Sequence, residues 1–283
     1  MSLMWIPLIT STVFLFGIGQ VLTKKGTTRL GSPGMLFLLS INMVLIYGGA
    51  WLFFHEGDFP DFRGVTYAAI ATFLSALGYI FFYEAVERQK ISIVGVITAA
   101  YPFITVILAV TFLHEPLTLG QVVGVVLIIG SVSLLSHTRR EKGNYDSRKQ
   151  TWLLLAVLCF VIWGIWAAAA KFAIDMVGYI TYAGIYSIVG PLTWIFYWHV
   201  RSGTFHLTRE DVQAELSVIF FCFGGLTFYA ALNYGLASIV TPFSNLYPFI
   251  TLVFARILLS ERLEKHRLIA VTLALSGILI LTF

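Results

Sequence analysis

The side chains best suited to binding a small organic molecule are a few aromatic and polar residues embedded in long apolar runs. Tyr79, Tyr83 and Glu84 lie within two helical turns of one run. Tyr229 and Asn233, four residues apart in another run, would share one face of a helix. A polar group in hydrocarbon is costly unless it faces a cavity or a partner. These residues predict an aromatic-walled pocket, with packing between helices as the alternative explanation.

Glu84 is the carboxylate that lies inside an apolar run rather than in a turn. A carboxyl group buried in a membrane protein is suited to proton coupling or to binding a cationic substrate as its counter-ion. Glu84 also stands within a turn of the end of its run, beside Glu87 and Arg88. The simpler interpretation is therefore a side chain that reaches the membrane interface.

Two prolines mark breaks in otherwise apolar helices. Pro102 and Pro248 each follow a tyrosine and precede a phenylalanine. Proline removes a backbone hydrogen bond, which a membrane protein tolerates where neighbours or a cavity satisfy the freed carbonyl. We expect these hinges to border the site, together with Thr98, Tyr101, Ser244, Asn245 and Tyr247. A hinge that serves packing alone is the alternative.

Other groups in the apolar runs are less specific. Four aromatic residues would serve a pocket or an interfacial belt equally: Trp163, Trp166, Tyr182 and Tyr186. The two cysteines, Cys159 and Cys222, also lie in apolar runs, where free thiols behave as small hydrophobes. We therefore expect no disulfide framework and no metal site.

The elements that carry these residues must be membrane-spanning helices. The 283 residues are 58% hydrophobic and 11% charged, with a mean hydropathy of +0.87, whereas roughly a quarter of a soluble protein is charged. A helix needs about 20 apolar residues to cross the hydrocarbon layer. Ten windows fit or nearly fit: 4–23, 33–54, 65–86, 91–113, 118–136, 151–175, 178–200, 214–235, 238–258 and 266–282. The first lacks a basic leader and an A-x-A cleavage site, so we expect it to be a retained span.

Basic residues are distributed unevenly over the connections between these windows. Arg63 lies on the side of the N-terminus, and the other Lys and Arg residues of the connections lie on the opposite side. By the positive-inside rule the basic side is cytoplasmic, which places both termini outside a cell (inner or plasma) membrane. The net charge of +4 is then a topology signal, and no nucleic-acid partner is expected.

The chain repeats itself. The segment Tyr101-Pro102-Phe103-Ile104-Thr105 recurs over residues 247–251, 146 positions later. Glu115 and Leu117 recur at the same offset as Glu261 and Leu263. Gly17, Ile18 and Lys24 match Gly164, Ile165 and Lys171 with a slip of one residue. The repeat therefore covers both halves of the chain.

Each copy holds five windows, so the second copy must enter the membrane from the opposite side. We predict an all-α integral membrane protein with ten transmembrane helices arranged as two inverted five-helix repeats. The repeats are residues 1–137 and 151–283, joined by a basic connection over 138–150. Inverted repeats make two conformations of similar energy available, which suits alternating access to a site near the membrane midplane.

The repeat also pairs Lys24 with Lys171. Long lysine stems can reach the membrane faces, and gating or binding of a substrate carboxylate is the functional alternative. Gly124, Gly130 and Gly277 permit close approach of helices, within the bundle or in a homodimer.

Several of these motifs together resemble paired EamA domains of the drug/metabolite transporter superfamily: the G-I-x5-K end of the first window, the Y-P-F-I-T segment, and the turn with Glu115 and Leu117. The resemblance covers essentially the whole chain. Phe14-Leu15-Phe16 stands where the first-span motif usually carries a tryptophan, whereas Trp163 preserves it in the second half. The resemblance implies a membrane transporter similar to exporters of amino acids and metabolites, although relatives also carry nucleotide sugars, triose phosphates and choline.

The sequence thus predicts a secondary transporter of small organic metabolites, exporting amino acids or related compounds, with choline-like cations as the alternative substrates. No enzyme is expected, because H-E-x-x-H, G-x-S-x-G and a pair of intramembrane carboxylates are all absent from the sequence. A scaffold would leave the inverted repeat unexplained. The expected partners are a small-molecule substrate and the lipid bilayer, and no cofactor is expected.

Overall fold

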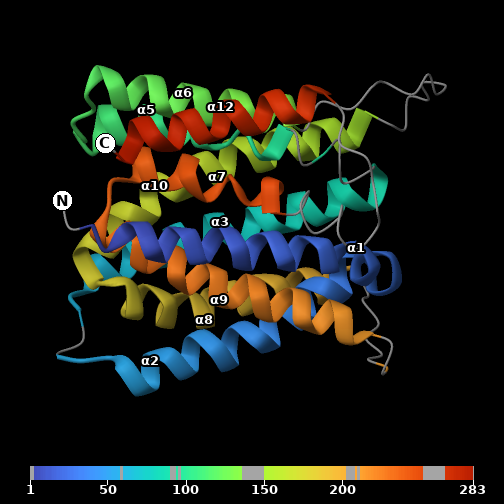
Figure 1. Ribbon diagram of the computed structural model, residues 1–283. Coiled ribbons are helices and arrows are strands. Elements are labelled where there is room, and N and C mark those ends of the chain that lie inside the picture. Colours follow the sequence, from blue (N-terminus) through green and yellow to red (C-terminus); the bar gives the residue numbers. More distant parts are fainter. Residues whose placement is uncertain are drawn as a thin grey trace.

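The computed structural model describes residues 3–57, 60–89, 94, 97–135, 150–201, 208, 211–250 and 265–282, and every regular element in these ranges is a helix (Figure 1). In chain order the elements are α1 (Trp5–Met43), η1 (Val44–Gly48), α2 (Gly49–Phe54), α3 (Phe62–Arg88), α5 (Pro102–Phe112), α6 (Leu119–Leu135), α7 (Gln150–Val177), α8 (Tyr179–Val200), α9 (Val212–Tyr234), α10 (Ala237–Ser244) and α12 (Lys265–Thr282). Within the described part, five helical stretches are long and apolar enough to span a membrane: Trp5–Thr23, Arg29–Phe54, Phe62–Arg88, Thr151–Val177 and Val212–Tyr234. The predicted all-α membrane fold is confirmed.

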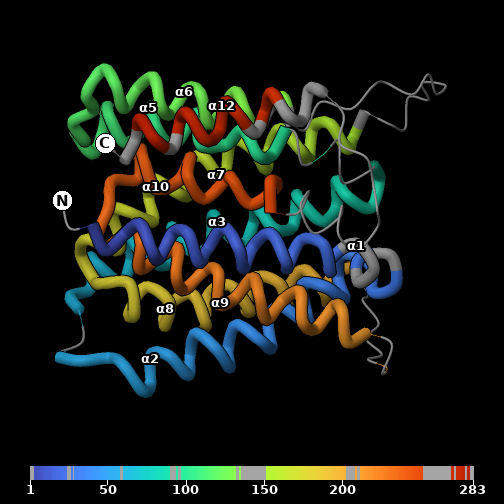
Figure 2. The backbone as a smooth tube through the Cα atoms, viewed as in Figure 1, coloured from blue at the N-terminus to red at the C-terminus, as the bar shows by residue number. Residues whose placement is uncertain are grey.

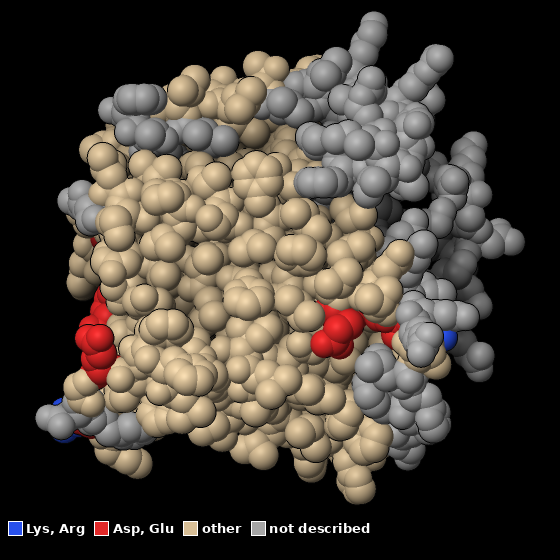
Figure 3. All heavy atoms as spheres, turned by 60° about the horizontal axis from the view of Figure 1, so that its bottom comes forward, with Lys and Arg blue, Asp and Glu red and all other residues tan. Residues whose placement is uncertain are grey.

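The helices run side by side along one axis, and both chain ends lie at the same end of the bundle (Figures 1 and 2). The face seen in Figure 3 carries acidic and basic side chains toward its two ends, with a wide uncharged area between them. Large apolar side chains such as Phe53, Phe62 and Phe196 are mostly exposed. Such a surface suits contact with lipid rather than water.

The first two spans are joined without a loop. Helix α1 is interrupted at Gly31, whose backbone angles of φ 64° and ψ 178° are not helical, and helical structure resumes before Pro33. A side chain at Gly31 would be strained at this positive φ, and its Cβ would lie 3.0 Å from Glu87 Oε1. Helical structure therefore fills much of the connection that the sequence predicts between 23 and 33.

Both proline hinges interrupt a helix rather than bend it. Pro102 stands in the first turn of α5, directly after a turn at residues 99–101. Pro248 follows a second turn at residues 245–246, where α10 has ended. A proline at the start of a helical segment costs little, because its missing N–H would have no partner there.

The internal repeat is visible in atomic contacts. A Cβ built on Gly17 would lie 2.6 Å from Ile250 Cβ and 3.0 Å from the Tyr247 carbonyl oxygen. A Cβ on Gly164 would meet the equivalent residues of the other half, Ile104 and Tyr101, at 2.5 Å and 3.1 Å. Each half therefore lets a helix with the G-I motif approach the Y-P-F-I segment of the opposite half.

Trp163 and its counterpart Phe16 follow the same repeat symmetry. Trp163 covers Gly78, and Phe16, its counterpart in the first half, covers Gly224. Trp163 contacts Tyr101 with ring centroids 6.0 Å apart, and Phe16 contacts Tyr247 at 6.1 Å. Among the described helices the most extensive packing is that of α1 on α9, and its counterpart α7 packs extensively on α3.

Candidate functional site

Eight aromatic side chains form a closed circuit at the centre of the bundle, where helices of both halves meet. Successive ring centroids lie 5.3 to 6.4 Å apart, which is the range of favourable aromatic contacts. In order, the circuit is Tyr79, Trp194, Tyr186, Tyr229, Phe228, Trp166, Tyr101 and Trp163. Tyr83 stacks on Tyr79 and is almost completely buried. The aromatic circuit is thus shared between the two repeats.

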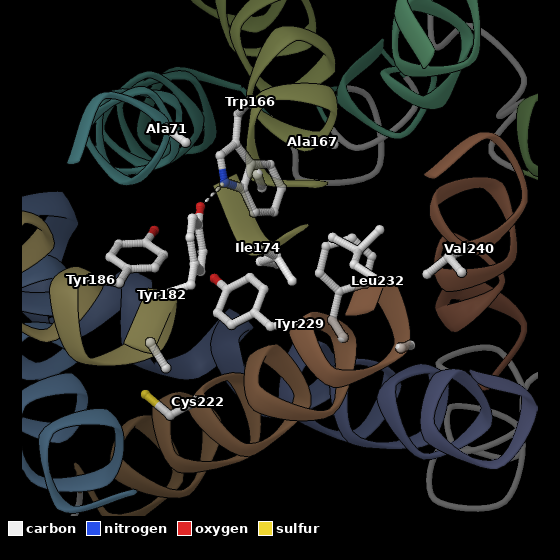
Figure 4. Packing of buried hydrophobic residues seen from close by; sticks show 14 of the residues in the cluster. Ala71, Trp166, Ala167, Ile174, Tyr182, Tyr186, Cys222, Tyr229, Leu232 and Val240 are labelled. Carbon is white, nitrogen blue, oxygen red and sulfur yellow. Dashed lines mark hydrogen bonds between the residues drawn. The ribbon is translucent and has the colours of Figure 1, made fainter. Parts of the chain in front are cut away.

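Hydrogen bonds fix several of these rings in place. The indole of Trp166 donates to the Tyr182 hydroxyl at 3.1 Å, and these side chains turn toward Tyr229 and Tyr186 in the close-up of Figure 4. The Tyr186 hydroxyl donates to Ser75 Oγ at 2.6 Å. Trp194 donates to the Ala76 carbonyl at 2.9 Å. The circuit therefore combines aromatic faces with hydroxyl groups held at defined positions.

The two helix breaks adjoin the circuit. Ser244 and Asn245 lie within hydrogen-bonding reach of the Tyr101 hydroxyl. Tyr247 lies within reach of Gln20 and packs against Phe16. Thr98 is buried one turn before Tyr101, and its hydroxyl donates to the Val94 carbonyl at 3.1 Å. The residues expected around both hinges are thus gathered beside the circuit.

A cavity of about 770 Å³ opens at the end of the bundle that holds both termini. It lies between the first turns of α1 and α8 and the last turns of α2 and α9. Asn233 and Glu56 line it, and the structure gives neither side chain a hydrogen bond or ion pair within the described residues. Ala230, next to Tyr229 of the circuit, also lines the cavity, so the cavity adjoins the circuit along α9.

The opposite end of the bundle holds an ion cluster around Glu84. Its carboxylate accepts a hydrogen bond from the Tyr197 hydroxyl and pairs with Arg88 and, at 3.2 Å, with Arg201. Tyr197 also contacts Ser32 Oγ at 3.3 Å, beside the Gly31 break. The Glu84 carboxylate raises the pKa of Arg201 above its ordinary value. The cluster ties α1 and α3 of the first half to α8 of the second.

A second ion pair links α1 to the part of the chain that follows α8. Arg29 lies 3.5 Å from Asp211, measured from Nε to Oδ1. Hydrogen bonds from the backbone N–H and the hydroxyl of Thr208, both 2.8 Å, lower the pKa of Asp211. The connection after α8 is thereby tied to the break in α1.

The predicted gating lysines are placed only in part. Lys171 pairs with Asp175, one turn later on α7, with Nζ 2.6 Å from Oδ1. The side chain of Lys24 lies outside the described residues. Their roles stay predictions.

The structure brings most of the predicted site residues together. Tyr79, Tyr83, Tyr101, Trp163, Trp166 and Tyr229 belong to the circuit or touch it, whereas Asn233 lies at the cavity and Glu84 in the ion cluster. Two buried aromatics that contact this group carried no clear signal in the sequence. Trp194 has only its mid-span position. Tyr47 packs closely over Gly225 in the structure, but nothing in the sequence pairs the two residues.

Comparisons with known proteins give the family. The model of the EamA-like transporter family matches residues 3–137 and again residues 150–283. The uncharacterized transporter YvbV of Bacillus subtilis is 30% identical over 145 residues, which are 48% of this chain and 45% of that protein. The uncharacterized protein MJ1333.1 of Methanocaldococcus jannaschii is 43% identical over 76 residues, 27% of this chain and 56% of that protein. The chain thus spans about half the length of the curated relatives it matches.

A solved crystal structure has the same fold. It superposes with a TM-score of 0.77 over 97% of this chain and 95% of that chain, at 13% sequence identity. A likeness at this identity shows the fold alone. The two family matches together cover nearly the whole sequence, one for each inverted repeat. The chain therefore belongs to the EamA-like transporter family.

Proposed function

We propose that this protein is a secondary transporter that exports amino acids or related small metabolites by alternating access. The observation that carries the proposal is the closed aromatic circuit, because helices of both inverted halves contribute to it. Exchanging the conformations of the two halves would turn a site open to one side into a site open to the other. The relative YvbV, which is named as a transporter, supports the same class.

The chemistry of the circuit favours a small amphipathic substrate. Tyrosine hydroxyls and the side chains of Ser244 and Asn245 offer hydrogen bonds to a zwitterion, and the ring faces suit its apolar part. The same faces would bind a quaternary ammonium group through cation–π contacts, which makes choline-like cations the second candidate. Glu84 is less suited to act as their counter-ion, because Arg88 and Arg201 already pair with it.

The two ends of the bundle support a direction of access. The cavity beside Asn233 lies at the end that holds both termini and reaches Ala230, the neighbour of Tyr229. At the opposite end, the ion cluster around Glu84 links helices of the two halves. We propose that this structure resembles the state in which the site communicates with the side of the termini.

We further propose that the protein lies in the cell membrane with its termini outside, because the Lys and Arg of the connections favour the other side as cytoplasmic. A C-terminal alkaline phosphatase fusion is then expected to be active and a C-terminal fluorescent protein fusion dark. The reverse result would overturn this orientation.

The function itself is tested by a ligand screen followed by flux. A ligand that binds the folded state alone raises its apparent Tm by mass action. We expect aromatic or branched amino acids to raise the Tm of the detergent-purified protein and to exchange across proteoliposomes that contain it. A response confined to quaternary amines would select the second candidate. A metabolite panel with neither a Tm shift nor flux would contradict the proposed transport.

A further inference from the structure

The second half of α10 and the turn that ends it at residues 245–246, together called the α10 break, contain buried oxygen atoms without partners among the described residues. Thr241 and Asn245, one helical turn apart, are 0% and 2% exposed. Thr241 Oγ1 and Asn245 Oδ1 have no hydrogen-bond partner among the described residues. The amide orientation of Asn245 is set by its own Nδ2, which donates to the Thr241 carbonyl at 3.2 Å. Leaving a buried polar atom unpaired costs about 1–3 kcal/mol, so each of these oxygens requires an explanation.

The backbone adds an acceptor to the same turn. Pro242 has no N–H to offer the carbonyl of Ser238, four residues earlier. Unwound or proline-interrupted segments of membrane transporters present such carbonyls to bound cations. Ser238, Thr241 and Asn245 recur every three or four residues and therefore share one face of the helix.

The first repeat lacks these groups. At the offset of 146, the counterparts of Thr241, Pro242 and Asn245 are Gly95, Val96 and Ala99. The first half therefore carries small or apolar residues at the equivalent positions, although it shares the Y-P-F-I-T segment that follows them. The oxygen groups are an addition of the second half, which argues for a bound ligand rather than for a structural need common to both repeats.

The charge nearby selects a cation. Glu115 is buried at the start of α10 and accepts hydrogen bonds from the backbone N–H of Ala237 at 2.8 Å, the backbone N–H of Ser238 at 2.9 Å and the Ser238 hydroxyl at 2.6 Å. The structure gives Glu115 no cationic partner within the described residues. Its carboxylate caps the first turn of α10, and Thr241 lies in the turn that follows. A buried negative charge in the neighbouring turn favours a positive ion over an anion.

The available space selects a small ion. Every residue from Ala237 to Leu246 is buried, and the oxygens of Ser238, Thr241 and Asn245 lie within about two helical turns, which suits a small ion better than the body of an organic amine. Neutral hydroxyl, amide and carbonyl oxygens bind hard cations. A singly charged cation can be bound by such oxygens without a carboxylate among its ligands. Hydrogen-bonded water would satisfy the same oxygens, but it would give no preference for sodium over other salts.

We propose that the α10 break is a sodium site, with Thr241 Oγ1, Asn245 Oδ1 and the Ser238 carbonyl as ligands and Glu115 as the nearby compensating charge. Sodium binding would hold α10 against the side of the aromatic circuit that contains Tyr101. Asn245 would bind the ion through Oδ1, and its side chain lies within hydrogen-bonding reach of the Tyr101 hydroxyl. The further consequence, that a sodium gradient drives transport, rests on the function proposed above. The binding site itself can be measured without any transport.

The test compares the thermal unfolding of the full-length protein in detergent in NaCl, KCl and choline chloride at equal ionic strength. We expect sodium to raise the apparent Tm by about 3 °C over the other salts. The double variant Thr241→Val/Asn245→Ala removes both side-chain oxygens and should lose this sodium-specific shift. Thr72→Val is the matched control, because its buried hydroxyl bonds only to carbonyls of its own helix; it should keep the shift.

Each result decides between clear alternatives. A wild-type protein without a sodium-specific shift, an equal shift in choline chloride, or a double variant that keeps the sodium shift would overturn the site. If the double variant does not fold, Thr241→Ser should retain the shift and Asn245→Ala should lose it. Binding of radioactive sodium to the wild-type protein, measured by equilibrium dialysis, gives a second readout. A metabolite-induced Tm shift without a sodium response would remove the sodium site and leave the transport proposal standing, and the opposite pattern would do the reverse.

Discussion

Replacing Tyr229 with alanine is expected to lower the rate of substrate flux in proteoliposomes about two- to tenfold. The Tyr229 ring contacts Tyr47, Tyr182 and Tyr186 at centroid distances of 5.0 to 6.2 Å. Loss of one aromatic contact to a substrate is worth about 0.5–1.5 kcal/mol, and about 1.4 kcal/mol corresponds to a factor of ten. Tyr229→Phe keeps the ring and should retain most of the flux.

Phe223 provides the control on the same helix. Its side chain is 48% exposed on the lipid-facing surface of α9, away from the circuit. Phe223→Ala should therefore transport at the wild-type rate, and size-exclusion profiles would establish that all three variants fold. Wild-type flux in Tyr229→Ala would exclude the aromatic circuit as the substrate site.

Replacing Gly164 with alanine is expected to destabilise the protein by about 1–3 kcal/mol, the usual cost of overpacking a core. Helix propensity alone predicts the opposite sign, because alanine favours a helix by about 1 kcal/mol over glycine. The close approach decides the outcome, since the added Cβ would lie 2.5 Å from Ile104 Cβ and 3.1 Å from a backbone oxygen. The measurement is the apparent Tm in detergent.

The chain supplies both a symmetry-related test and a control for this substitution. Gly17→Ala should destabilise to a similar extent, because Gly17 makes the same approach to Ile250 in the other half. Gly130→Ala should leave the Tm unchanged or raise it, because nothing lies within 4 Å of its added Cβ. Equal effects at Gly164 and Gly130 would contradict the argument from close packing.

The fold could be predicted because its determinants are periodic or repeated. The apolar windows give the helices, and the recurrence of Y-P-F-I-T gives the inverted relation of the halves. The break at Gly31 was not predictable in form. A glycine and a proline two residues apart indicate a loop as readily as the short interruption that joins two spans in α1.

The site could be predicted only where the repeat or an unusual side chain marked it. Tyr101, Trp163 and Tyr229 stood out as aromatic residues in matched positions, and the structure places them in one circuit. Trp194 is one of several aromatic residues in its apolar run, with Phe196, Tyr197 and Trp198 close behind it, and nothing in the sequence distinguishes a ring that faces the centre from one that faces lipid. Of the partners of Glu84, the sequence indicated only Arg88, which is four residues away. Arg201 and Tyr197 could not be predicted, because they lie more than a hundred residues further along the chain.

The pairing of α1 with α9 has a consequence for biosynthesis. The first helix finds its main partner in residues 212–234, so it cannot complete its packing until most of the chain has been made. At a synthesis rate of roughly 5–20 residues per second, α1 waits in the membrane for about 10 to 40 s with its Gly19 face, which packs on α9, uncovered. The non-local pairing that interlocks the two halves also makes assembly a late event, set by the arrival of the eighth span rather than by insertion of the first.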